Sequence, residues 1–151
     1  MPLEPGDDAP NFDLVDQDGK AVSLAGLKGG KVLLYFYPKD DTPGCTKEAC
    51  QFNDSLQRFN DQSVTVLGVS ADNQASHQRF IAKYSLGFPL LVDEGAETAR
   101  AYGAYGEKSF MGRTSVGIKR STFLIDEQGK IERAWYNVRP DGHPEAVLGQ
   151  L

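Results

Sequence analysis

Short apolar runs alternate with longer segments of helical periodicity along this chain of 151 residues, and this alternation constrains the fold more than any other feature. The run Val32–Tyr37 is continuously apolar or aromatic and lies between a Gly-Gly pair and Pro38. Such a run is typical of a short strand that is buried on both faces. We therefore expect it at the centre of a β-sheet that helices cover on both sides.

The other elements are expected before and after this central strand. Residues 12–15 and 21–24 flank a turn with Gly19 and predict an opening β-hairpin. Further strands are expected at 64–70, 89–92, 122–126 and 131–136, the last two as an antiparallel pair, and helices at 43–60, 74–84, 97–102 and 144–148. Residues 103–118 are expected to form a loop without finer assignment. This order predicts an α/β fold with a mixed central sheet, in a single domain over residues 1–151.

Charge and composition exclude several classes of function. The chain has 16 basic and 21 acidic residues and a formal net charge of −5, so no basic field attracts nucleic acid or anionic lipid. No stretch approaches the roughly 18 apolar residues of a membrane span. The first twelve residues have neither a basic start nor an apolar core, so we expect no signal or transit peptide and a cytoplasmic location.

The two cysteines, Cys45 and Cys50, are too few for a secreted disulfide scaffold or for a four-ligand zinc site. The two histidines, His77 and His143, are far apart in sequence, so we expect no metal site and place both at the surface or behind another group. In a reducing cytoplasm, any disulfide between the two cysteines would be transient.

Cys45 is expected in the first turn of the helix at 43–60. Thr42 is a favourable N-cap and Pro43 a favourable first helical residue, which places Cys45 at the third position. The positive end of the helix favours thiolate over thiol there. Cys45 also begins an apolar stripe along the helix, so the residues favour a reactive thiol and a buried core thiol about equally.

Cys50 alters that balance. It points about 140° away from the stripe and is expected to face outward. In an intact helix the Cα atoms of the two cysteines would lie roughly 8.6 Å apart, whereas a disulfide needs about 7 Å or less. Bridging therefore requires the first turns to unwind, and the low helix propensity of Gly44 helps. The hypothesis is a Cys45 sulfenic acid captured by Cys50; the alternative is an incidental exposed thiol at Cys50.

The segment from Pro38 to Cys50 resembles the active-site segment of the peroxiredoxins. It has the pattern Pro-x-x-x-Thr-x-x-Cys, and a second cysteine five positions later is typical of the peroxiredoxin Q or bacterioferritin comigratory protein subfamily. The similarity also covers residues 6–12, 87–93 and 119–126 and extends over essentially the whole chain.

The resemblance implies a thioredoxin-like fold and a thiol-dependent peroxidase that reduces hydrogen peroxide and organic hydroperoxides without metal, haem or flavin. It implies that Cys45 is the peroxidatic cysteine and Cys50 the resolving one, joined in an intramolecular disulfide. Thr42 would contact peroxide and thiolate, Pro38 would shield the site, and Arg120 would supply positive charge.

For Glu48, orientation of Arg120 and simple exposure on the helix surface are equally favoured. The resemblance further implies recycling by thioredoxin or a glutaredoxin-type reductant, and a monomer or weak dimer. Two other readings stay open, a one-cysteine peroxidase and a redox-sensing interaction module whose helix unfolds on oxidation.

Overall fold

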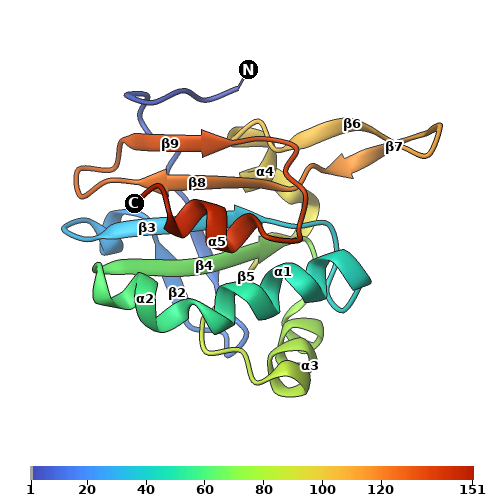
Figure 1. The fold of residues 1–151 in the computed structure, drawn as a ribbon, viewed down its shortest axis with the longest axis horizontal. Helices are drawn as coiled ribbons and strands as arrows, with labels where there is room; N and C mark the ends of the chain where they lie inside the picture. The colour runs from blue at the N-terminus through green and yellow to red at the C-terminus, as the bar shows by residue number, and fades with distance from the viewer. Residues whose placement is uncertain (1) are drawn as a thin grey trace.

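The computed structural model describes residues 2–151, in which seven strands form one sheet in the order β2-β1-β5-β4-β3-β8-β9 (Figure 1). The strands are β1 (Asp13–Val15), β2 (Ala21–Ser23), β3 (Lys31–Phe36), β4 (Val64–Ser70), β5 (Leu90–Val92), β8 (Ser121–Ile125) and β9 (Ile131–Trp135). β3, β4 and β5 are parallel, whereas β1 pairs antiparallel with β5, and β8 pairs antiparallel with β3 and β9. The predicted mixed sheet, its opening hairpin and its late antiparallel pair are confirmed.

β3 lies between β4 and β8 and is buried on both faces, as its apolar run predicts. Leu33 and Tyr35 belong to the core on one side of the sheet, and Leu34 and Phe36 to the core on the other. Since successive side chains of a strand point to opposite faces, a strand with two cores has to be apolar at every position.

Helices lie on both faces, as expected. The helices are α1 (Pro43–Asp54), α2 (Leu56–Asp61), α3 (Gln74–Tyr84), α4 (Glu97–Ala101) and α5 (His143–Leu148), with short 3-10 turns η1 (Ala25–Leu27) and η2 (Glu94–Ala96). α1, α2, α3 and α5 contribute to the core that contains Cys45, whereas α4 contributes Ala99 to the opposite core. α5 lies beside α1, and both cover the same face of the sheet (Figure 1).

The single helix predicted over residues 43–60 is in fact two helices, α1 and α2, because the helical backbone is interrupted at Ser55. Its backbone leaves the helical region at φ −98° and ψ 1°. The Ser55 hydroxyl is buried and accepts a hydrogen bond from Arg58 Nη2 at 3.2 Å. Serine side chains offer such alternatives to helical hydrogen bonding, and the apolar periodicity that continues to Phe59 conceals the break.

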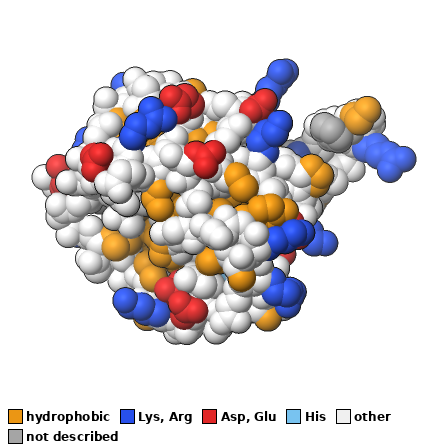
Figure 2. All heavy atoms as spheres, turned by 60° about the horizontal axis from the view of Figure 1, so that its bottom comes forward, with side chains coloured by type: hydrophobic (Ala, Val, Ile, Leu, Met, Phe, Trp, Pro, Cys, Tyr) orange, Lys and Arg blue, Asp and Glu red, His pale blue; other side chains and the backbone are white. Residues whose placement is uncertain are grey.

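The segment 103–118 is not a plain loop but contains a hairpin of β6 (Tyr105–Phe110) and β7 (Arg113–Ile118). Met111 and Gly112 both have positive φ, which is typical of the tight turns that join twisted antiparallel strands. The hairpin stands clear of the body of the molecule (Figure 2), with Met111 87% and Val116 64% exposed. Few apolar positions face a core here, so the sequence carries no clear period.

Within residues 2–151, no helix combines the length and the apolar character that crossing a membrane requires.

Candidate active site

Cys45 lies in the first turn of α1, directly after the loop that follows the central strand β3. Thr42 is the N-cap residue, and Pro43 is the first helical residue. The thiol is only 2% exposed and belongs to the core beneath α1. The position is as predicted, at the positive end of a helix and at the carboxyl end of a sheet strand, where open α/β sheets hold ligands.

Arg120 lies immediately before β8, and its side chain extends to the Cys45 thiol. Its Nη2 group donates a hydrogen bond to Cys45 Sγ at 3.3 Å, and its Nη1 group donates to Glu48 Oε1 at 2.7 Å. Cys45 and Arg120 are separated by 75 positions in the chain. One guanidinium therefore holds both the sulfur and a carboxylate on the next helical turn.

Glu48 is not a surface carboxylate, because its side chain is fully buried. Burial raises the pKa of Glu48 to about 7, although the charge and the hydrogen bond of Arg120 act in the opposite direction. Its Oε2 atom has no hydrogen-bond partner among the described residues. Two interpretations of Glu48 were equally favoured by the sequence, exposure on the helix surface and contact with Arg120. The structure shows the contact with Arg120.

Gly44 permits the close approach of Arg120 to the helix. A Cβ atom at this position would lie 3.2 Å from Arg120 Nη2 and 3.3 Å from Pro140 Cγ, closer than most such contacts. The missing side chain therefore lets the guanidinium and residue 140 lie directly against the first turn of α1.

Thr42 and Pro38 belong to the segment between β3 and α1 that precedes Cys45, and both are half-buried. The Thr42 side chain makes no capping hydrogen bond to the helix, contrary to the capping role expected from its residue type. Instead its hydroxyl donates to the Lys39 carbonyl at 2.8 Å. Because that proton is directed at a carbonyl, the hydroxyl oxygen is free to act as an acceptor.

Cys50 is on the same intact helix as Cys45, and both are free thiols. It is half-buried rather than fully outward-facing. Burial, with a smaller contribution from the charge of Asp54, raises the pKa of the Cys50 thiol. In the folded helix Cys50 is therefore kept in its less nucleophilic form, since the thiolate is the reactive species.

Lys108 is a basic residue near the site that the sequence does not reveal. It lies on β6, and its Nζ donates to the Ile118 carbonyl at 2.8 Å. Burial lowers its pKa, and Cys45 and Arg120 are the two groups whose charges act on it. Its segment shows no pattern, so only the folded hairpin places this second cation near the thiol.

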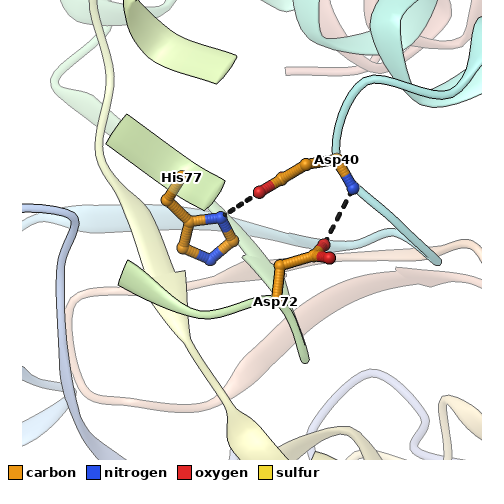
Figure 3. A group of neighbouring side chains, drawn as sticks. All are labelled: Asp40, Asp72 and His77. Carbon is orange, nitrogen blue, oxygen red and sulfur yellow. Dashed lines mark hydrogen bonds and ion pairs between the residues drawn. The ribbon is translucent and has the colours of Figure 1, made fainter. Parts of the chain in front are cut away.

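The loop between β3 and α1 is held by a group of three side chains, the buried Asp40 and His77 and the half-buried Asp72 (Figure 3). Asp40 Oδ2 lies 2.6 Å from His77 Nδ1 and accepts from Ser76 Oγ at 2.8 Å, and the Asp40 amide donates to Asp72 Oδ2 at 2.8 Å. His77 Nε2 donates to the Leu91 carbonyl at 2.9 Å. These atoms are used in hydrogen bonds, which identifies the group as an anchor for the loop.

Of the two positions expected for His77, at the surface or behind another group, the surface position is wrong, since the residue is fully buried. The helix pattern around it is polar, so the sequence does not reveal its partner, which comes from a distant loop. The N-cap of α3 is Asn73, whose side chain accepts a hydrogen bond from the Ser76 amide.

His143 is also buried and not at the surface, which was one of the two positions expected for it. It begins α5, and its Nε2 lies 2.8 Å from Thr122 Oγ1. Burial, followed by repulsion from Arg120, lowers the pKa of His143 to about 4. The neutral ring packs edge-on against Phe52 and Trp135, and it therefore joins α5 to α1 and β9.

Comparison with known proteins assigns this arrangement to a family. The AhpC/TSA family matches residues 5–134. A relative from Coxiella burnetii named "Putative peroxiredoxin bcp" is 48% identical over 151 residues, which is all of both chains. "Peroxiredoxin Bcp" of Escherichia coli strain K12 is 46% identical over 150 residues, 99% of this chain and 96% of the relative. The chain therefore belongs to the peroxiredoxins, the thiol peroxidases of the AhpC/TSA family.

Solved structures narrow the assignment. A crystal structure of PrxQ from Xylella fastidiosa matches with a TM-score of 0.92 at 37% identity, over 99% of this chain and 96% of that one. A structure of the bacterioferritin comigratory protein of Xanthomonas campestris, described for its alkyl peroxide reduction activity, matches with a TM-score of 0.86 at 39% identity, over 92% and 88% of the two chains. Within the peroxiredoxins, the chain is of the bacterioferritin comigratory protein or peroxiredoxin Q type, with a thioredoxin-like fold.

Proposed function

We propose that this peroxidase works through Cys45 as the peroxidatic and Cys50 as the resolving residue. The observation that carries the proposal is the contact of Arg120 with Cys45 Sγ at 3.3 Å, at the positive end of α1. Arg120 and the helix end both favour the thiolate, which is the nucleophile. The substrates are hydrogen peroxide and organic hydroperoxides, which the thiolate attacks at an oxygen atom.

In the first step the Cys45 sulfur forms a bond to the distal peroxide oxygen while the O–O bond breaks. The products are a Cys45 sulfenic acid and, after one proton is taken up, an alcohol or water. Arg120 stabilises the negative charge that develops on the departing oxygen. The Thr42 hydroxyl accepts a hydrogen bond from the peroxide, and Pro38 shields the thiolate from bulk water. Lys108, on the β6–β7 hairpin, adds positive charge near the Cys45 thiolate.

In the second step Cys50 attacks the sulfenic acid of the same chain, which forms the Cys45–Cys50 disulfide and releases water. The helix has to unwind first because of the separation of the two residues in α1. A dithiol protein such as thioredoxin or a glutaredoxin-type reductant then restores both thiols. Since both cysteines come from one helix, the cycle needs no second copy of the chain, in keeping with a monomer in the reducing cytoplasm.

Replacement of Cys45 tests the first step. Cys45→Ser removes the sulfur that Arg120 contacts, so peroxide consumption in a thioredoxin-coupled assay should fall to the background rate. Appreciable turnover by this variant would contradict the proposed role of Cys45.

Replacement of Cys50 tests the second step. Cys50→Ser should consume at most about two equivalents of peroxide for each chain and then stop, because the sulfenic acid has no partner thiol in the chain and can only be oxidised further to a sulfinic acid. Sustained thioredoxin-driven turnover would instead indicate a one-cysteine peroxidase. Oxidation of the unmodified protein without sustained turnover would indicate a redox sensor.

A further inference from the structure

A short segment before α5 contacts α1 at both ends of its first turns, and we call residues 138–142 the C-terminal strap. The Val138 amide donates to the Arg120 carbonyl at 3.0 Å, next to the residue that contacts Cys45. Pro140 lies against Gly44, at the start of α1. The strap therefore contacts the helix at the turn that holds the peroxidatic cysteine.

The strap also contacts α1 directly after Cys50, through the side-chain amide of Gln51. Gln51 Nε2 donates to Asp141 Oδ1 at 2.8 Å, and Gln51 Oε1 accepts from the Gly142 amide at 2.8 Å. Both halves of one amide group are thus used on neighbouring strap residues. The two ends of the segment that has to unwind, Gly44 and Gln51, are consequently held by the same five residues.

The strap cannot easily follow α1 when the helix moves, because α5 fixes it to the rest of the fold. His143 contacts Thr122 of β8 at 2.8 Å, Val147 is fully buried in the core, and Glu145 accepts from Arg58 of α2 at 2.6 Å.

Gln51 adjoins Cys50, with consecutive Cα atoms about 3.8 Å apart. A displacement of Cys50 toward Cys45 would therefore strain or break both Gln51 hydrogen bonds.

We propose that Gln51 is a positioning residue whose amide, held by the C-terminal strap, slows the unwinding of α1 that the Cys45–Cys50 disulfide requires. This inference rests on the proposed function of the two cysteines. The sulfenic acid of Cys45 has two fates. Attack by the Cys50 thiol gives the disulfide and water, whereas attack on a second peroxide gives a sulfinic acid and an alcohol or water. A slower unwinding favours the second fate, so Gln51 sets the sensitivity of the enzyme to over-oxidation.

The test is quench-flow mass spectrometry of disulfide and sulfinic acid in the full chain after addition of excess hydrogen peroxide. Gln51→Ala should speed disulfide formation about three- to tenfold, as expected for the loss of two partly exposed hydrogen bonds, and should lower the sulfinic fraction. Alanine has a higher helix propensity than glutamine, so intrinsic propensity would act in the opposite direction. Asp141→Ala, which removes one of the two Gln51 hydrogen bonds and the ion pair with Lys47 at 3.8 Å, should act in the same direction with a smaller effect. Asp141→Asn, which keeps an acceptor oxygen for Gln51 Nε2, should change the rate less than Asp141→Ala does.

The matched control is Gln57→Ala, since Gln57 Nε2 donates to Asp61 of its own helix α2 and, among the described residues, Gln57 has no side-chain hydrogen bond to the strap. It should leave both measured quantities unchanged. In a Cys50→Ser background, Gln51→Ala should leave the rate of Cys45 oxidation unchanged, which a general disturbance of the site would not.

Equal disulfide rates for Gln51→Ala and the unmodified protein would overturn the role of Gln51 while the proposed function stands. Failure of the unmodified protein to form the Cys45–Cys50 disulfide would instead overturn the proposed function, and this inference with it.

Discussion

Arg120 bonds two groups that compete for its charge, the Cys45 sulfur and the Glu48 carboxylate. Glu48 orients the guanidinium through the 2.7 Å contact, but it also draws positive charge away from the thiol. The carboxylate is kept in the core at an electrostatic cost, since burial raises the pKa of Glu48 to about 7. We infer that the ion pair with Glu48 fixes the position of the Arg120 guanidinium, at the expense of part of the positive charge that Arg120 offers to the thiol.

The raised pKa of Glu48 predicts a dependence of stability on pH. Between the unfolded value of 4.5 and the folded value of about 7, the folded protein binds more protons. The stabilisation is therefore fully present below pH 4.5 and is lost as pH rises through 7. Relative to Glu48→Gln, the free energy of unfolding of the unmodified reduced protein should fall by about 2 kcal/mol from pH 5 to pH 8. Urea denaturation at both pH values measures this difference, and a constant gap would refute the assignment.

At the scale of elements, α1 serves two purposes that oppose each other. Intact, it places Cys45 at a positive helix end; to resolve the sulfenic acid, its first turns have to unwind. Beyond Cys50 the helix is held by Asn53, which donates to the Ser85 carbonyl and accepts from the Gly87 amide. We therefore expect the unwinding to end before Asn53 and the remainder of α1 to keep its place.

Circular dichroism should detect this change in α1. Oxidation by one equivalent of peroxide should remove helical signal equal to about two turns, and a dithiol reductant should restore it. The Cys50→Ser variant is the control and should keep its helical signal after oxidation. An unchanged far-ultraviolet spectrum of the disulfide form would show that the cysteines join without unwinding.

At the scale of the whole molecule, elements with two buried faces or a strong helical period could be predicted, and contacts between distant segments could not. β3 and the start of α1 follow from local patterns, because burial on both faces and an N-cap leave a local signature. Arg120 was indicated only by resemblance, since its contact with Cys45 exists because the sheet order puts β8 beside β3. The buried positions of His77 and His143 depend in the same way on partners from distant segments.

The β6–β7 hairpin is an element that no local sequence pattern predicts. Its strands bury little apolar surface, so no period of two reveals them, and Lys108 acquires its place near Cys45 only through the folded hairpin. Charge and composition carry no information on which side chains converge.

The central claim is that Cys45 and Cys50 of one chain form a disulfide after Cys45 reacts with peroxide. It is tested most directly by peptide mapping with mass spectrometry, after the reduced protein is mixed with one equivalent of hydrogen peroxide and its remaining thiols are alkylated. The account predicts a monomeric product in which both cysteines escape alkylation and the peptide that contains them carries an internal disulfide. Alkylation of Cys50 in the oxidised product, or a disulfide between two chains, would contradict the claim.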